Sequence, residues 1–200
     1  MAEILKLKQA VNAPPSEVYR AFTHSTVLRE WLCDAAQASA RKGGRLYLWW
    51  NSGYYASGEF ANLVPDKKIA FTWRGRGEPD DSRVQVTLAA KGGGTLLTLR
   101  HTVGSGAKWT RAIKEIESGW KAGLENLQSA FETGQDLRLV RRPLLGINVG
   151  AFDGKAAAAL GVPVKQGVWL DGTAEGLGAR AAGLQKDDVI VGLGGKKVTS

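Results

Sequence analysis

Apolar side chains recur three or four residues apart between Lys108 and Glu132, a spacing that places them on one face of a helix. Charged residues fill the opposite face, so we expect a long helix that is buried on one side only. Gly119 and Gly123 each lower helix propensity by about 1 kcal/mol, which predicts close approach of a strand or a ligand. Gly134 stands where a C-terminal cap is expected. The apolar face contains Trp109, Ala112, Ile113, Ile116, Trp120, Leu124, Leu127 and Phe131.

The chain before this helix consists of short apolar segments separated by turn residues. We expect a first strand over residues 4–11, a helix with Ser16 as its N-cap, and a second short helix over residues 27–32. Further strands are expected between residues 43 and 102, because Gly, Pro and Asp clusters recur there between β-rich segments. One face of the last three strands carries Ile69, Phe71, Trp73, Val84, Val86, Leu88, Leu97, Leu99 and His101. We expect this face to meet the long helix.

These elements predict an α+β fold in which a long helix lies across a curved antiparallel sheet. Aromatic residues are concentrated in this part of the chain: Trp49, Trp50, Tyr54, Tyr55, Phe60, Phe71, Trp73, Trp109 and Trp120. Aromatic side chains can fill a core completely, or they can line a pocket for an apolar ligand. The pattern leaves both possibilities open.

Composition narrows the class of protein. The formal net charge is +8, but the basic residues are dispersed and no nucleic-acid-binding motif accompanies them, so we expect no nucleic-acid partner. No apolar run approaches the roughly 20 residues of a membrane span, and no signal peptide is recognisable. The single cysteine, Cys33, cannot form an intramolecular disulfide. We therefore expect a cytoplasmic protein without a membrane span.

Few residues are suited to catalysis or metal binding. With His24, His101 and one cysteine, no standard zinc pattern can be assembled, and we expect neither a metal nor a cofactor. His101 is expected on the sheet face that meets the helix, as a packed residue or as a polar contact of a ligand. An enzyme would need polar groups inside the cavity. The candidates besides His101 are Tyr54, Tyr55, Glu59 and Arg100.

Residues 8–133 carry a family resemblance in five segments: APPSEVYRAFTHSTVLREWL, GGRLYLWW, GEFANLVPDKKIAFTW, LTLRHTV and GLENLQSAFE. These segments resemble the START-like, or SRPBCC, helix-grip domain of activator of heat shock protein 90 ATPase homologues. The resemblance implies a cavity between sheet and helix that binds an apolar small molecule or lipid. It places Phe71, Trp73, Val86, Leu97, Leu99, His101, Trp120 and Leu124 in the cavity wall. The chaperone activator has a chaperone-binding domain ahead of this one, and this chain opens with the first strand, so we do not expect chaperone activation.

The chain becomes richer in glycine after residue 133 and resembles a bacterial, HtrA-type PDZ domain. The resemblance rests on RPLLGI at residues 142–147 and on the AGL and DVI tripeptides near residue 185. It implies that the C-terminal peptide of a partner adds as a strand along residues 147–149. The loop of Leu144, Leu145, Gly146 and Ile147 would hold the terminal carboxylate. Because the sequence stops before the helix that completes such a groove, we expect a truncated domain, or one that another chain completes.

The expected organisation is a helix-grip domain over residues 1–133, a linker over 134–142 and the first part of a PDZ-like domain over 143–200. The leading interpretation is a non-catalytic protein in which an apolar-ligand domain is coupled to a peptide-binding module. One alternative is a cyclase or hydrolase of the START superfamily. Another is a co-chaperone-like adaptor with a filled core that binds only proteins.

Overall fold

The computed structural model describes residues 2–141 and 145–199. The chain divides into two compact units, Met1–Arg141 and Arg142–Ser200. Leu144 of the predicted peptide-binding loop lies outside the described residues, as do Arg142 and Pro143. Each unit is described by itself below.

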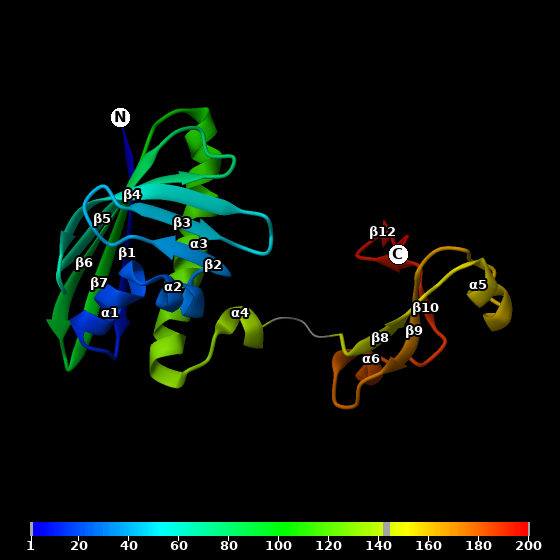
Figure 1. The fold of residues 1–200 in the computed structure, drawn as a ribbon. Helices are drawn as coiled ribbons and strands as arrows, with labels where there is room; N and C mark the ends of the chain where they lie inside the picture. Colours follow the sequence, from blue (N-terminus) through cyan, green and yellow to red (C-terminus); the bar gives the residue numbers. More distant parts are fainter. Residues whose placement is uncertain (1, 142–144, 200) are drawn as a thin grey trace. The chain divides into compact units, whose positions relative to one another are not determined.

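The first unit is an α+β fold built on a seven-stranded sheet, as expected (Figure 1). The strands lie in the order β1-β7-β6-β5-β4-β3-β2, and all neighbours are antiparallel. The elements are β1 Glu3–Val11, α1 Pro15–Thr23, α2 Ser25–Trp31, β2 Ala35–Ala38, β3 Arg45–Trp49, β4 Tyr55–Val64, β5 Lys68–Gly75, β6 Ser82–Lys91, β7 Gly94–Val103, α3 Ala107–Thr133 and α4 Leu137–Val140.

The long helix α3 confirms the prediction made from the spacing of its apolar residues. It runs from Ala107 to Thr133, and Gly134 caps it with a left-handed φ of 70°. Trp109, Ile116, Trp120, Leu124 and Leu127 of its apolar face are buried. They pack with the inward residues of β5, β6 and β7, which are the alternating positions expected to face the helix. The helix is therefore held against the concave side of the sheet (Figure 1).

Two local predictions are corrected. Ser16 is not the N-cap of α1: Pro14 caps this helix and Pro15 occupies its first turn. Proline at the first helical position has its φ already set and needs no side-chain cap, so the helix begins earlier. The strand β2 was not expected, because Ala35–Ala38 is a short segment of residues with low β propensity, and its pairing with β3 decides its conformation.

Residues 135–141, which lie in the predicted linker, belong to the first unit and contact its helices α2 and α3. The short helix α4 begins after Asp136, whose side chain accepts a hydrogen bond from the Arg138 amide. Arg138 Nη2 donates to the Arg29 carbonyl at 2.7 Å, and Arg141 forms an ion pair with Glu125. This segment thus packs on α2 and α3.

The only cysteine, Cys33, lies in the core of the first unit just after α2. Its thiol faces the Leu28 carbonyl at 3.7 Å. Burial raises the pKa of this thiol to about 11, so it is protonated at neutral pH. Cys33 is therefore a packing residue of the core.

The second unit has two small sheets and little core. A three-stranded sheet has the order β10-β9-β8, and a two-stranded sheet joins β11 to β12. Among its described residues, the buried hydrophobic ones are Ala157, Leu170 and Ala179. The elements are β8 Ile147–Gly150, α5 Gly154–Leu160, β9 Val168–Thr173, α6 Gly178–Ala181, β10 Val189–Ile190, β11 Gly192–Leu193 and β12 Lys196–Lys197.

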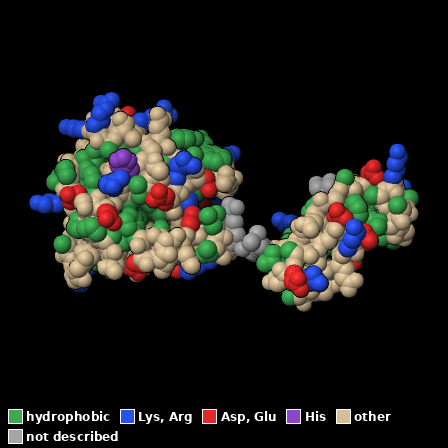
Figure 2. Space-filling view, turned by 60° about the horizontal axis from the view of Figure 1, so that its bottom comes forward, with side chains coloured by type: hydrophobic (Ala, Val, Ile, Leu, Met, Phe, Trp, Pro, Cys, Tyr) green, Lys and Arg blue, Asp and Glu red, His purple; other side chains and the backbone are tan. Residues whose placement is uncertain are grey.

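The surface agrees with a dispersed basic charge. On the face shown in Figure 2, Lys and Arg side chains appear as separate groups among acidic and neutral ones and form no continuous patch. Within residues 2–141 and 145–199, no helix combines the length and hydropathy needed to cross a membrane.

Candidate functional site

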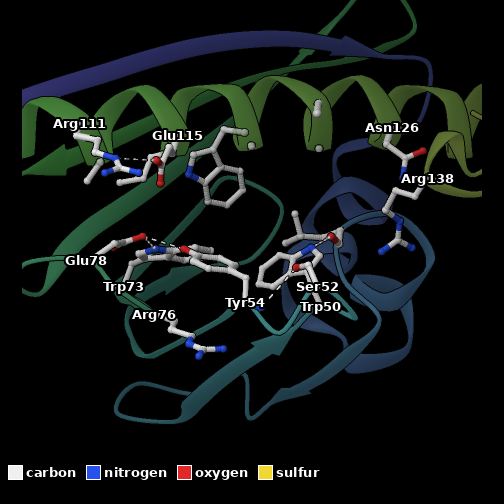
Figure 3. Close-up of a pocket in the computed structure, with 18 of the residues that line it drawn as sticks. Trp50, Ser52, Tyr54, Trp73, Arg76, Glu78, Arg111, Glu115, Asn126 and Arg138 are labelled. Carbon is white, nitrogen blue, oxygen red and sulfur yellow. Dashed lines mark hydrogen bonds and ion pairs between the residues drawn. The ribbon is translucent and has the colours of Figure 1, made fainter. Parts of the chain in front are cut away.

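A cavity of about 710 Å³ lies in the first unit between α3 and the loops at one end of β3, β4 and β5 (Figure 3). Its size falls within the roughly 300–1,000 Å³ of small-molecule sites. Aromatic rings form its centre, and charged side chains lie at its ends and mouth. The lining residues are Trp31, Leu32, Trp50, Ser52, Tyr54, Trp73, Arg76, Gly77, Glu78, Lys108, Arg111, Ala112, Glu115, Ile116, Gly119, Trp120, Ala122, Gly123, Asn126 and Arg138.

Four tryptophans line the cavity, and hydrogen bonds hold the indole of each. The acceptors come from elements around the cavity, so each ring has a set orientation and presents apolar surface. Trp73 and Trp120 also pack on each other, with ring centres 5.4 Å apart. The four hydrogen bonds are Trp31 to the Ala21 carbonyl at 2.9 Å, Trp50 to the Leu32 carbonyl at 2.6 Å, Trp73 to Glu78 Oε1 at 3.0 Å and Trp120 to His101 Nδ1 at 3.0 Å.

His101 lies beneath Trp120 and is fully buried. Its Nε2 is 2.7 Å from Ser82 Oγ, and that hydroxyl donates its single proton to the Trp73 carbonyl at 3.0 Å. His101 Nε2 must therefore carry the hydrogen, while Nδ1 accepts from Trp120. Burial lowers the pKa of His101 to about 4, which agrees with a neutral imidazole. His101 supports the cavity wall from behind.

Glu78 supplies a carboxylate at one end of the cavity. It lies in the turn between β5 and β6, and its Oε1 accepts hydrogen bonds from Tyr54 Oη at 2.8 Å and from Trp73 Nε1 at 3.0 Å. Burial, followed by the charge of Glu78, raises the pKa of Tyr54, so the phenol stays a donor. Tyr54, Trp73 and Glu78 thus form one polar cluster within an aromatic wall.

Arg138 and Asn126 lie at the other end (Figure 3). The Asn126 side chain is 2% exposed and joins three elements. Its amide nitrogen donates to the Trp31 carbonyl at 2.6 Å and to Asp136 Oδ1 at 2.9 Å, and its oxygen accepts from the Leu137 amide at 2.6 Å. These bonds hold α4, and with it Arg138, at the cavity.

The two glycines of α3 behave differently from each other. A Cβ on Gly123 would lie 3.2 Å from the Leu32 side chain, so the prediction of close approach is confirmed there. A Cβ on Gly119 would meet no atom within 4 Å, so no strand packs against that position, and close approach of a ligand there stays a prediction. Because Gly119 lines the cavity, the space in front of it belongs to the cavity itself.

The structure separates the eight predicted wall residues into two groups. Trp73 and Trp120 line the cavity. The other six do not line it but are buried in the packed core between sheet and helix: Phe71, Val86, Leu97, Leu99, His101 and Leu124. Contact of these six with a ligand stays a prediction.

The residues considered for an enzyme are dispersed. Tyr54 lines the cavity, whereas Tyr55, Glu59 and Arg100 are exposed and do not line it. In the part of the chain that the structure describes, no three His, Cys, Asp or Glu side chains gather as metal ligands would.

Several lining residues lie outside the predicted cavity wall, above all Glu78 and Arg138, and Trp50 was named only among the aromatic residues that could line a pocket. Glu78 lies in a segment of turn residues between two expected strands, and Arg138 lies in the predicted linker. Strand alternation identifies residues that face a core but gives no direction for side chains in loops. The density of tryptophan around residue 50 was the one available signal.

The fold and the cavity define an SRPBCC-like, helix-grip class: an antiparallel sheet closed around a long helix with an aromatic-lined space between them. Residues 12–132 match the family model described as activator of Hsp90 ATPase homolog 1-like protein. The chain belongs to this family. The matched region ends within α3, and the PDZ-like identity of the second unit stays a prediction.

Proteins that are similar to this chain in sequence or in structure are consistent with this family membership. The activators of 90 kDa heat shock protein ATPase homolog 1 from Mus musculus and Homo sapiens are 31% identical over 84 residues. That match covers 42% of this chain and 24% of theirs, so it spans about a quarter of those relatives. CalU16 from Micromonospora echinospora is 28% identical, with a TM-score of 0.56 over 66% of this chain and 78% of its own. An HSP90 activator from Plasmodium falciparum is 26% identical, with a TM-score of 0.54 over 62% of this chain and 92% of its own.

Proposed function

We propose that the first unit binds an apolar small molecule in the cavity beneath α3 and does not catalyse a reaction on it. The observation that carries this proposal is the wall of four tryptophans, each held by a hydrogen bond around a space of about 710 Å³. A wall fixed in advance loses little side-chain entropy when a ligand enters. Membership of an SRPBCC-like family supports small-molecule binding.

The cavity favours binding over catalysis. His101 has both ring nitrogens engaged and stands behind Trp120, so it has no free nitrogen to accept a substrate proton. Tyr54 and Glu78 are bonded to each other, and the raised pKa of Tyr54 opposes its use as a base near neutral pH. We do not extend chaperone activation to this chain, since the match covers 24% of the named activators.

A substitution that fills the mouth of the cavity tests ligand binding. Gly119→Phe places a ring in open space on the cavity side of α3. We expect methylnaphthalene to bind the unaltered chain in isothermal titration calorimetry and to lose at least tenfold in affinity to this variant. Ser118→Phe is the matched control, because Ser118 is exposed on the same turn and does not line the cavity. Equal affinity for both variants would place the apolar site elsewhere.

We also propose that the second unit binds the C-terminal peptide of a protein partner. Strand β8 lies at the edge of its sheet, and Val149 on it is 62% exposed. Leu145 beside it is 46% exposed, and Gly146 has a positive φ of 70° that shapes the loop. An added strand could pair along this edge while backbone amides of Leu145, Gly146 and Ile147 hold a carboxylate.

Paired peptides test this second proposal. A library of peptides is offered in free and C-terminally amidated forms, and backbone amide shifts of residues 145–149 are followed by NMR. We expect free peptides alone to shift these resonances, since amidation removes the terminal charge. Equal binding of the free and the amidated peptides would contradict the assignment of this loop as the carboxylate-binding site.

A further inference from the structure

Two buried side-chain polar atoms in the described part of the chain have no hydrogen-bond partner, Glu78 Oε2 and Arg138 Nη1. Both residues line the aromatic cavity, and Figure 3 shows them on opposite sides of its aromatic rings. A buried polar atom without a partner is costly, and such atoms are uncommon in folded proteins. Their coincidence at one cavity indicates groups that await a ligand or water.

The residues around Glu78 hold its carboxylate in a fixed orientation. Its Oε1 is doubly occupied by Tyr54 and Trp73, which fixes the side chain and leaves Oε2 as the oxygen with unused lone pairs. Gly75, which is buried, makes this arrangement possible, because a Cβ there would collide with both Glu78 Oε1 and Tyr54 Oη. Arg138 differs, since its Nε and Nη2 are already bound to Asp136 and the Arg29 carbonyl.

A group that satisfies Glu78 Oε2 must donate a hydrogen, so a hydroxyl and an ammonium are the chemical alternatives. The charges around the cavity decide between them. Among the charged lining residues, Arg138 is paired with Asp136 and Arg111 with Glu115, which leaves the cations Arg76 and Lys108 against the carboxylate of Glu78. An ammonium would add a further cation to this surplus, whereas a hydroxyl donates without adding charge.

We propose that Glu78 is the polar anchor of the cavity and accepts a hydrogen bond from a hydroxyl group of an otherwise apolar, aromatic-sized ligand. This assignment rests on the proposed function of the first unit and names the class of molecule bound there. The apolar body of the ligand lies against Trp50, Trp73 and Trp120, and its hydroxyl lies at the Tyr54 end. The hydrogen bond is charge-assisted and shielded from water, which makes it one of the stronger kinds.

Three probes with the same ring system test the anchor in the full, unaltered chain: methylnaphthalene, naphthol and naphthylmethylamine, measured by calorimetry at neutral pH. We expect naphthol to bind about tenfold more tightly than methylnaphthalene, and naphthylmethylamine to bind no more tightly than methylnaphthalene. Glu78→Gln should remove the preference for naphthol while methylnaphthalene still binds. Glu117→Gln on α3, whose carboxylate does not line the cavity, should keep the preference.

The outcomes distinguish a failure of the Glu78 anchor from a failure of the proposed function of the first unit. If naphthol and methylnaphthalene bind the unaltered chain equally, water satisfies Glu78 and the anchor is wrong, while apolar binding stands. Tighter binding of the amine would overturn the hydroxyl assignment. If methylnaphthalene itself does not bind, the proposed function fails and the anchor fails with it. Because the probe comparison uses the unaltered chain, it decides the matter even if Glu78→Gln does not fold.

Discussion

Burial and two hydrogen bonds hold the imidazole of His101 in its neutral form beneath Trp120. Protonation would turn Nδ1 into a donor that faces the indole N–H of Trp120, and would place a charge in the core. At the scale of single residues, the cavity wall therefore depends on His101 Nδ1 remaining unprotonated. A fall in pH therefore affects this wall through His101, although His101 does not line the cavity.

This dependence predicts how stability changes with pH. The pKa of His101 is about 4 in the folded protein and 6.5 in the unfolded chain, so the unfolded chain takes up the proton first as pH falls. The contribution of His101 is complete above pH 6.5 and is lost between pH 6.5 and about 4. It amounts to about 3 kcal/mol. Urea unfolding across this range measures the loss, and NMR titration of the two imidazoles should assign it to His101. An imidazole of His101 that titrates near 6.5 would contradict it.

Two glycines predict opposite effects of the same substitution. Gly58→Ala in β4 drives a Cβ into the Thr72 carbonyl of β5, and we expect a loss of about 2 kcal/mol or more in the free energy of unfolding. Gly119→Ala meets open space within α3, and we expect a gain of up to about 1 kcal/mol from helix propensity. Urea denaturation of both variants checks the signs. A loss at Gly119 would mean that the space before it is not open.

At the scale of elements, the regular parts of the fold were predictable, whereas most of the residues that line the cavity were not. The spacing of apolar residues predicted α3, and alternation on β5, β6 and β7 predicted the face that meets it, because these patterns follow from helix and strand geometry. The family resemblance implied that Phe71, Leu97 and Leu99 belong to the cavity wall; they are buried in the core, and their contact with a ligand stays a prediction. Loops and α4 determine the position at which the sheet and the helix diverge. The apolar residues of these segments have no regular spacing, so the sequence pattern does not predict that position.

The fastening of α4 provides a test at this scale. Asn126→Ala removes the donor to the Trp31 carbonyl and the acceptor of the Leu137 amide, and so leaves these two backbone groups without that partner. Asp136 Oδ1 keeps its hydrogen bonds from Arg138. We expect a loss of about 3 kcal/mol in the free energy of unfolding and faster hydrogen exchange of the Leu137 amide. Gln128→Ala on the same helix is the control, because its partners are side chains nearer the surface. A similar small change in both variants would show that α4 is held in another way.

At the scale of the whole molecule, the two units differ in how much core they hold. The first unit buries an extensive cluster, and the described residues of the second bury three hydrophobic side chains while Leu145, Val149, Val191 and Leu193 stay exposed. Stability per residue follows buried apolar area. We therefore expect the first unit to supply most of the cooperative unfolding signal.

The boundary of the first unit can be measured. A chain of residues 1–141 retains α4 and its bonds to Asn126 and Arg29, whereas a chain of residues 1–133 loses them. We expect the longer chain to be more stable by about 3 kcal/mol, because the shorter one leaves the buried Asn126 side-chain oxygen without its partner and its nitrogen with the Trp31 carbonyl alone. Thermal and urea unfolding of the two chains compare them directly. Equal stability would assign residues 134–141 to a linker, as the sequence suggested.

Cys33 has a practical consequence. With its sulfur enclosed after α2 and its proton retained at neutral pH, the native thiol should ignore maleimide reagents. A Gly119→Cys variant would then offer a single reactive sulfur at the edge of the aromatic cavity. A fluorophore attached there would report occupancy in real time without any background from the rest of the chain, and no further engineering of the protein would be needed.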